Sequence, residues 1–146
     1  MHIIAELSPY AKHHVLFRYM MHRKALLFAG PGNEITEELR NGWKIHPREL
    51  RSLGRKIPNF SDEMWEENRF TIVVEGNYLK FSQNEELRIK LLATGNRELV
   101  EASPRDRIWG VGFGAKNAGL RRDRWGLNLL GKALMQVRQR LVEEAV

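Results

Sequence analysis

The 146-residue chain contains no cysteine, and no apolar run approaches the roughly 18 residues that a membrane-spanning helix needs. Without cysteine there can be no disulfide framework, which is compatible with a reducing compartment, and we expect a cytoplasmic or nuclear location. The first residues lack a basic stretch followed by an apolar block, which argues against a secretory signal peptide. We therefore expect no membrane partner.

Positive charge dominates the chain, with 24 lysines and arginines against 18 acidic residues and a formal net charge of +6. Arginine supplies most of it, and the planar guanidinium suits bidentate contact with phosphate. This balance favours an anionic partner, either a nucleotide-like small molecule or a nucleic acid. Charge that serves only solubility is the alternative that composition leaves open.

Apolar periodicity and capping residues predict a chain made mostly of helices. The expected helices run from Ser8-Pro9 to Gly30, after Asn33, from His46-Pro47 to Gly54, from Ser61, from Asn84 to Gly95, and from 129 to about 143. The segment that follows is ambiguous, because 70–74 has strand propensity while the apolar spacing over 65–79 is helical. We interpret it as helix from the family resemblance given below. The predicted fold class is α+β, a helix-dominated single domain over residues 1–146 with little strand content.

Residues 103–110 combine turn-forming and chemically active side chains. Ser103-Pro104 and Gly110 predict irregular backbone between them. Within this turn a carboxylate, Asp106, precedes a large aromatic, Trp109, by three residues. Such a turn can present a carboxylate and a flat ring to one cleft, as work on a nucleobase–sugar bond requires. A solvated turn with Trp109 packed into the core is the structural alternative.

Several short motifs follow one another along the chain, each of them once. They are 19–28 (YMMHRKALLF), 53–55 (LGR), 59–60 (NF) with Trp65, 79–84 (LKFSQN), 91–95 (LLATG), 99–104 (LVEASP), 106–110 (DRIWG) and 125–131 (WGLNLLG). Together they resemble the NADAR (NAD and ADP-ribose) family from about Tyr19 to Leu141. We expect 19–143 to be family-like and 1–18 to diverge.

The resemblance implies an N-glycosidase. Members of the family are similar to enzymes that cut the base–ribose bond of phosphorylated riboflavin-pathway intermediates, and related members remove ADP-ribose from guanine. The implied partner is a phosphorylated N-riboside or an ADP-ribose-type ligand, with ADP-ribosylated nucleic acid as a further possibility. No cofactor is implied, and the five histidines show no zinc-ligand spacing, so we expect no metal.

The resemblance also assigns roles to particular residues. Asp106 and Lys24 are the expected catalytic residues, the first as an electrostatic or acid–base carboxylate, the second as a nucleophile on ribose C1 or a phosphate partner. Glu101 is an alternative carboxylate. The expected substrate-binding residues are Trp65, Trp109, Arg55 and Asn128. The glycine-rich run 110–117 and the start of the last helix could offer backbone N–H groups to a phosphate.

Two positions depart from the family pattern. Phe17 occupies the position of a family glutamate that is a key catalytic residue, and Leu127 replaces the usual lysine of a Gly-Lys-Asn motif. Phe17 lies seven residues, about two turns, before Lys24, so both should face the same cleft. Because a phenyl ring cannot relay a proton, a catalytically impaired binding module is the alternative function. Direct nucleic-acid binding through the arginines is a third hypothesis.

Overall fold

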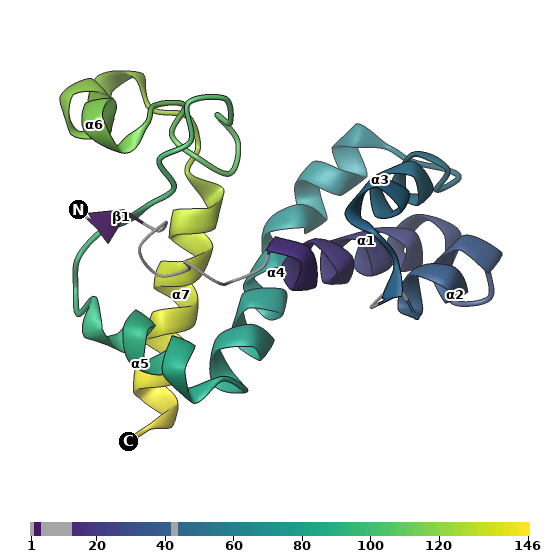
Figure 1. The fold of residues 1–146 in the computed structure, drawn as a ribbon, viewed down its shortest axis with the longest axis horizontal. Helices are drawn as coiled ribbons and strands as arrows, with labels where there is room; N and C mark the ends of the chain where they lie inside the picture. The colour runs from purple at the N-terminus through teal and green to yellow at the C-terminus, as the bar shows by residue number, and fades with distance from the viewer. Residues whose placement is uncertain (1, 4–12, 42–43) are drawn as a thin grey trace. The chain divides into compact units, whose positions relative to one another are not determined.

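The computed structural model describes residues 2–3, 13–41 and 44–146, and side chains from Leu16 onward within these ranges. Helices dominate this part of the chain, and its strands form one two-residue pair (Figure 1). The predicted helix-dominated α+β class is therefore confirmed. The chain divides into two compact units, one of residues 11–76 and one of residues 1–10 with 77–146.

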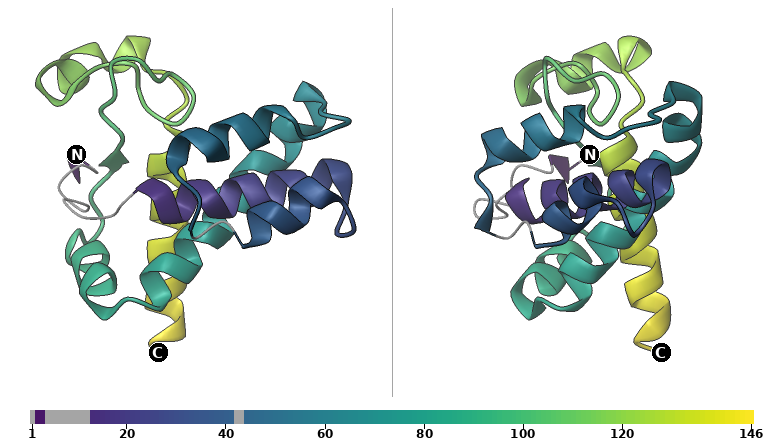
Figure 2. Two further views of the ribbon diagram at one scale, coloured as in Figure 1. Left: turned by 45° about the vertical axis from the view of Figure 1, so that its right-hand side comes forward. Right: turned by 90° about the vertical axis from the view of Figure 1, so that its right-hand side faces the viewer.

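The unit of residues 11–76 is built from α1 (His13–Ala29), α2 (Glu34–Arg40), α3 (Pro47–Arg55) and the first part of α4 (Asp62–Ser82). The helices α1, α2 and α3 contact one another (Figures 1 and 2). The cap predicted at Ser61 is present, and Asn33 and His46 also cap the helices that follow them: Asn33 Oδ1, His46 Nδ1 and Ser61 Oγ each accept a hydrogen bond from a backbone N–H of the following helix. The start predicted at Ser8-Pro9 lies outside the described residues.

A hydrophobic core ties α1, α2 and α3 together. Its buried members are Met21, Ala25, Phe28, Leu39, Leu50 and Ile57. Close approach of α3 to α1 depends on Gly54, where an added Cβ would lie 2.7 Å from the Met21 sulfur. The prediction that Gly54 ends this helix is wrong, since α3 continues through it to Arg55. This glycine serves helix packing rather than helix termination.

The other unit carries α5 (Glu85–Ala93), α6 (Ala115–Ala118), the 3-10 helix η3 (Gly119–Arg124) and α7 (Leu129–Glu144). Its strands β1 (His2–Ile3) and β2 (Leu99–Val100) pair in parallel. Helix α7 contacts both β2 and α5 (Figure 1). Buried Ala133, Leu134, Val137 and Leu141 form the apolar face predicted for α7.

The ambiguous residues 65–79, which include the strand-prone 70–74, lie inside α4 and are helical. Ile72 and Val73 are buried there, so tertiary burial outweighs their β propensity. In contrast, α6 and η3 were not predicted, because their sequence is short, polar and rich in arginine. The turn predicted at 103–110 has no helix or strand, as expected.

Candidate functional site

Phe17, Met21 and Lys24 of α1 line a pocket with Arg51, Gly54 and Arg55 of α3. Its volume is about 330 Å³. The seven-residue spacing predicted that Phe17 and Lys24 would face the same cleft, and both line this pocket. Two of the residues expected in the site, Lys24 and Arg55, are thereby brought together. Phe17, where we expected a departure from the family pattern, lines the same pocket.

Aromatic rings surround the ammonium group of Lys24. Its Nζ lies 4.4 Å from the ring centre of Phe60 and 5.5 Å from that of Trp65, distances typical of cation–π contacts. Burial lowers the pKa of Lys24 below its ordinary value, and the nearby carboxylate of Asp62 opposes this shift. The neutral amine is therefore more accessible than in an exposed lysine.

Arg51 and Arg55 stand one turn apart on α3, and both are exposed. Among the described side chains, neither guanidinium has an ion-pair or hydrogen-bond partner. The pocket is thus lined by three cationic groups, with Lys24 on the facing helix, and by no acidic residue. This arrangement favours an anionic ligand.

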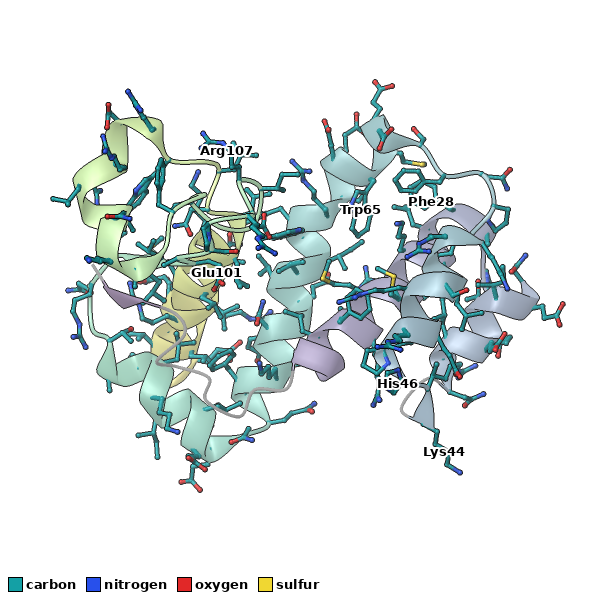
Figure 3. The ribbon with its side chains drawn as sticks, turned by 45° about the horizontal axis from the view of Figure 1, so that its top comes forward. Phe28, Lys44, His46, Trp65, Glu101 and Arg107 are labelled. Atoms are coloured by element: carbon teal, nitrogen blue, oxygen red, sulfur yellow. The ribbon has the colours of Figure 1, made fainter. Side chains whose placement is uncertain are left out.

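Trp65 packs against the α1–α3 core as well as over Lys24. It is half-buried, and Figure 3 shows it on α4 with Phe28 of the core labelled beside it. Trp65 therefore has a structural role, and a ligand contact by its ring would come in addition to it. Phe60, whose side chain is 42% exposed, is the more accessible ring beside Lys24.

Asp106 organises the turn that carries Trp109. One oxygen, Oδ1, accepts hydrogen bonds from the backbone N–H groups of Ile108, at 2.9 Å, and Trp109, at 2.8 Å. This is the capping geometry of an Asx turn. Asp106 and Trp109 belong to the same turn, and both side chains are half-buried. The carboxylate consequently has a structural task besides any chemical one.

The segment 126–130 is joined to the same turn by backbone hydrogen bonds. The N–H groups of Gly126, Leu127, Asn128, Leu129 and Leu130 donate to carbonyls within 107–111. Figure 3 labels Arg107 and Glu101 in this region. The N–H groups of Leu129 and Leu130, at the start of the last helix, are therefore already donated to carbonyls of the turn, while a phosphate contact by the glycine-rich run 110–117 stays a prediction. What these bonds provide is a fixed frame for Asp106 and Trp109.

Asn128 holds this frame to the strand β2. Its backbone has a left-handed conformation (φ 51°), and its buried side chain bonds backbone groups at both ends. Nδ2 donates to the Leu99 carbonyl at 2.9 Å, and Oδ1 accepts from the Glu101 N–H at 3.0 Å. We expected the side-chain amide of Asn128 to bind substrate, but both of its polar atoms form hydrogen bonds with the protein backbone.

The expected site residues fall into two groups, each within one unit. Lys24, Trp65 and Arg55 belong to residues 11–76, while Asp106, Trp109 and Asn128 belong to the other unit. Sequence reasoning did not assign Arg51 or Phe60 to the site. Arg51 could have been found from its four-residue spacing to Arg55, and Phe60 from its place in the NF motif.

Two further features concern the described residues alone. No group of three or more histidine, aspartate or glutamate side chains in that part could hold a metal ion. None of the helices formed by the described residues is long and apolar enough to cross a membrane.

The sequence model of the NADAR domain matches residues 7–142. A protein named as an N-glycosidase of Acanthamoeba polyphaga mimivirus is 46% identical over 84% of this chain and 71% of its own length. Protein irg-1 of Caenorhabditis elegans is 35% identical over 85% of this chain and 58% of its own. The chloroplastic riboflavin biosynthesis protein PYRR of Arabidopsis thaliana is 31% identical, and the chain spans 24% of it.

A solved structure supports the same relationship. The solution structure of the Escherichia coli protein YbiA superposes with a TM-score of 0.61 at 29% identity, covering 87% of this chain and 68% of that one. Its counterpart in Shigella flexneri is named as an N-glycosidase and is 34% identical over 63% of this chain. The chain belongs to the NADAR domain family.

Proposed function

We propose that this protein is an N-glycosidase that hydrolyses the base–ribose bond of a phosphorylated N-riboside or of an ADP-ribosyl-guanine adduct. The observation that carries the proposal is the pocket in which Lys24 faces Arg51 and Arg55 without an acidic lining residue. Such a pocket offers one amine of lowered pKa and two permanent cations. Relatives named as N-glycosidases, including the mimiviral protein, support the reaction class.

Cleavage of the C1–N bond leaves positive charge on the ribose while the departing base takes the electron pair. The neutral amine of Lys24 is suited to attack C1, which forms a C–N bond to the lysine as the base leaves and takes up a proton. Water then replaces the lysine at C1 and regenerates the amine. Burial of Lys24 supports this role, because it raises the fraction of neutral amine at a given pH.

In the other unit, we assign roles to Asp106 and Trp109 from the family resemblance. A carboxylate stabilises the positive charge that develops on the sugar, and a flat indole can stack on the base. Asp106 keeps Oδ2 outside the two backbone hydrogen bonds that Oδ1 accepts. Asn128 contributes by holding this turn to β2 through its two backbone contacts.

The test is incubation with phosphorylated N-ribosides, NAD and ADP-ribosylated guanine, followed by mass spectrometry for released base. Lys24→Ala serves as the inactive control, and Arg40→Ala serves as a matched control because Arg40 is exposed on α2 and does not line the pocket. The proposal requires base release by the wild type that Lys24→Ala abolishes and Arg40→Ala preserves. Release that is equal in all three proteins contradicts it.

The second candidate function is an ADP-ribose or nucleotide-binding module without turnover. Phe17 favours it, because an apolar ring lines the pocket where the family carries a glutamate. Such a module would bind the ligands named above and leave them intact. Ligand binding measured without base release would select this alternative.

A further inference from the structure

We propose that Phe60 is a positioning residue for Lys24: the face of its ring holds the protonated side chain of Lys24 in place and releases it when the amine becomes neutral. The contact between ring and ammonium group needs no substrate. Only the reaction of the released amine rests on the N-glycosidase function proposed above.

The ring of Phe60 lies closer to the charge of Lys24 than the ring of Trp65 does. The distance from Nζ to the ring centre is 4.4 Å for Phe60 and 5.5 Å for Trp65. Lys24 is half-buried, and a cation–π contact is stronger where the cation is partly removed from water. A lysine has a long, flexible stem that samples many conformations when it is exposed. Contact with two rings therefore restricts Nζ to fewer positions.

The backbone and the core both fix the ring of Phe60. The preceding residue, Asn59, has φ 62°, in the left-handed region that is costly for most residues and less so for asparagine. Such a conformation persists only where the surrounding structure determines it. The ring of Phe60 also packs on buried Phe28, with the ring centres 5.0 Å apart and the planes tilted by 60°. A ring held in this way can in turn hold the lysine.

The contact depends on the charge of Lys24. The quadrupole of a ring attracts an ammonium group and has no comparable attraction for a neutral amine. Loss of the proton therefore frees the side chain to turn toward a ligand. Burial lowers the pKa of Lys24, whereas a ring that stabilises the ammonium form opposes that shift. The other charged groups that act on Lys24 or line its pocket are Asp62 of α4 and Arg51 and Arg55 of α3.

The experiment measures the pKa of Lys24 in the ligand-free protein by NMR titration of the lysine Cε signals, with Lys24→Ala used to assign the signal. Phe60→Leu keeps an apolar side chain over the amine and removes the ring. Phe60→Trp supplies the ring that attracts cations most strongly. We expect the pKa to fall by about half a unit or more in Phe60→Leu, and to equal or exceed the wild-type value in Phe60→Trp.

Two controls separate this effect from a general loss of structure. Phe113→Leu makes the same substitution at a half-buried ring in the other unit and should leave the pKa of Lys24 unchanged. Lys80 is an internal reference, because burial also lowers its pKa and the ring beside its amine is Phe81. Its titration should be the same in the wild type and in every Phe60 variant.

A pKa of Lys24 that is unchanged in Phe60→Leu, or that falls equally in Phe60→Leu and Phe60→Trp, overturns the proposal. If circular dichroism shows that Phe60→Leu does not fold, pentafluorophenylalanine at position 60 replaces it. This residue keeps the shape of the ring and removes its negative face, so the same fall is expected and its absence is equally decisive.

The pH profile of base release from a phosphorylated N-riboside, measured on the same variants, connects the contact to the reaction. Its rising limb should move to lower pH in Phe60→Leu by the same amount as the pKa of Lys24. A shifted pKa without base release in any variant contradicts only the proposed function. Base release with an unshifted pKa in Phe60→Leu contradicts only the role of Phe60.

Discussion

The carboxylate of Asp106 holds the backbone of Trp109, whose N–H donates to Asp106 Oδ1 at 2.8 Å. The same oxygen accepts from Ile108, and the following carbonyls accept from the start of α7. The candidate carboxylate and the candidate base-stacking ring are therefore parts of one turn. A substitution of Asp106 therefore removes the carboxylate and also disturbs the backbone of Trp109, unless the new side chain keeps an oxygen that accepts these hydrogen bonds.

Asp106→Asn should separate chemistry from structure. Asparagine keeps an Oδ1 that can accept from Ile108 and Trp109, but it lacks the charge that would stabilise the developing cation. We expect turnover to fall about 10²-fold or more with ligand affinity largely kept. Asp106→Ala should in addition lower the free energy of unfolding by about 1–2 kcal/mol through loss of the cap. Steady-state kinetics and urea unfolding measure the two effects, and unchanged turnover in Asp106→Asn removes the carboxylate from the mechanism.

The two tryptophans should respond differently to truncation. Trp109→Ala should weaken ligand binding by about 1–3 kcal/mol if a base stacks on the indole. Trp65→Ala should mainly lower stability, by about 2–4 kcal/mol, because Trp65 packs on the α1–α3 core. Calorimetric binding and thermal unfolding of both variants provide the comparison. Loss of stability in Trp109→Ala without a selective binding effect would assign that ring to packing alone.

The pH dependence of base release should follow the amine of Lys24. Burial lowers its pKa and the Asp62 carboxylate opposes that shift, so a neutral amine acting on C1 gives activity that rises with pH. Asp62→Asn removes the opposing charge, lowers the pKa of Lys24 further and should move the rising limb to lower pH. Glu63→Gln, the next acid in the same helical turn, is the matched control and should leave the limb in place. A limb that moves equally in both variants, or not at all, speaks against Lys24.

Two glycines provide a test of the backbone packing around the turn of Asp106 and Trp109. At Gly126 an added Cβ would overlap the backbone of Arg107, whereas at Gly114 it would meet open space. Gly126→Ala should therefore lower the free energy of unfolding by more than about 2 kcal/mol, and Gly114→Ala should change it little. Denaturant unfolding of the two variants checks the difference. Equal stability would show that 107 and 126 are not packed as described.

Much of the helical architecture follows from local signals. Asn33, His46, Ser61 and Asn84 each cap the helix that was predicted to follow them. Local signals failed at Gly54, where contact with Met21 decides the role of the glycine.

The candidate site was less accessible to sequence reasoning. Motif order pointed to Lys24 and Arg55, and helical spacing predicted that Phe17 faces the same pocket as Lys24, which all three residues line. The structural use of Asn128 depends on contacts to Leu99 and Glu101, which are 29 and 27 residues away in the chain. No local sequence pattern predicts such long-range contacts. The sequence therefore marked Asn128 as a site candidate without indicating which groups its side-chain amide binds.

Phe17→Glu, compared with the wild type, tests the account most directly. A glutamate at this position introduces the acid that the family resemblance leads us to expect beside Lys24, and Phe17→Gln is the uncharged control. The measurement is the rate of base release from a 5′-phosphorylated N-riboside, followed by mass spectrometry. We predict slow release by the wild type, clearly faster release by Phe17→Glu, and no gain in Phe17→Gln. Absence of release in both the wild type and Phe17→Glu, with ribose 5-phosphate still bound, would contradict an N-glycosidase and identify a binding module.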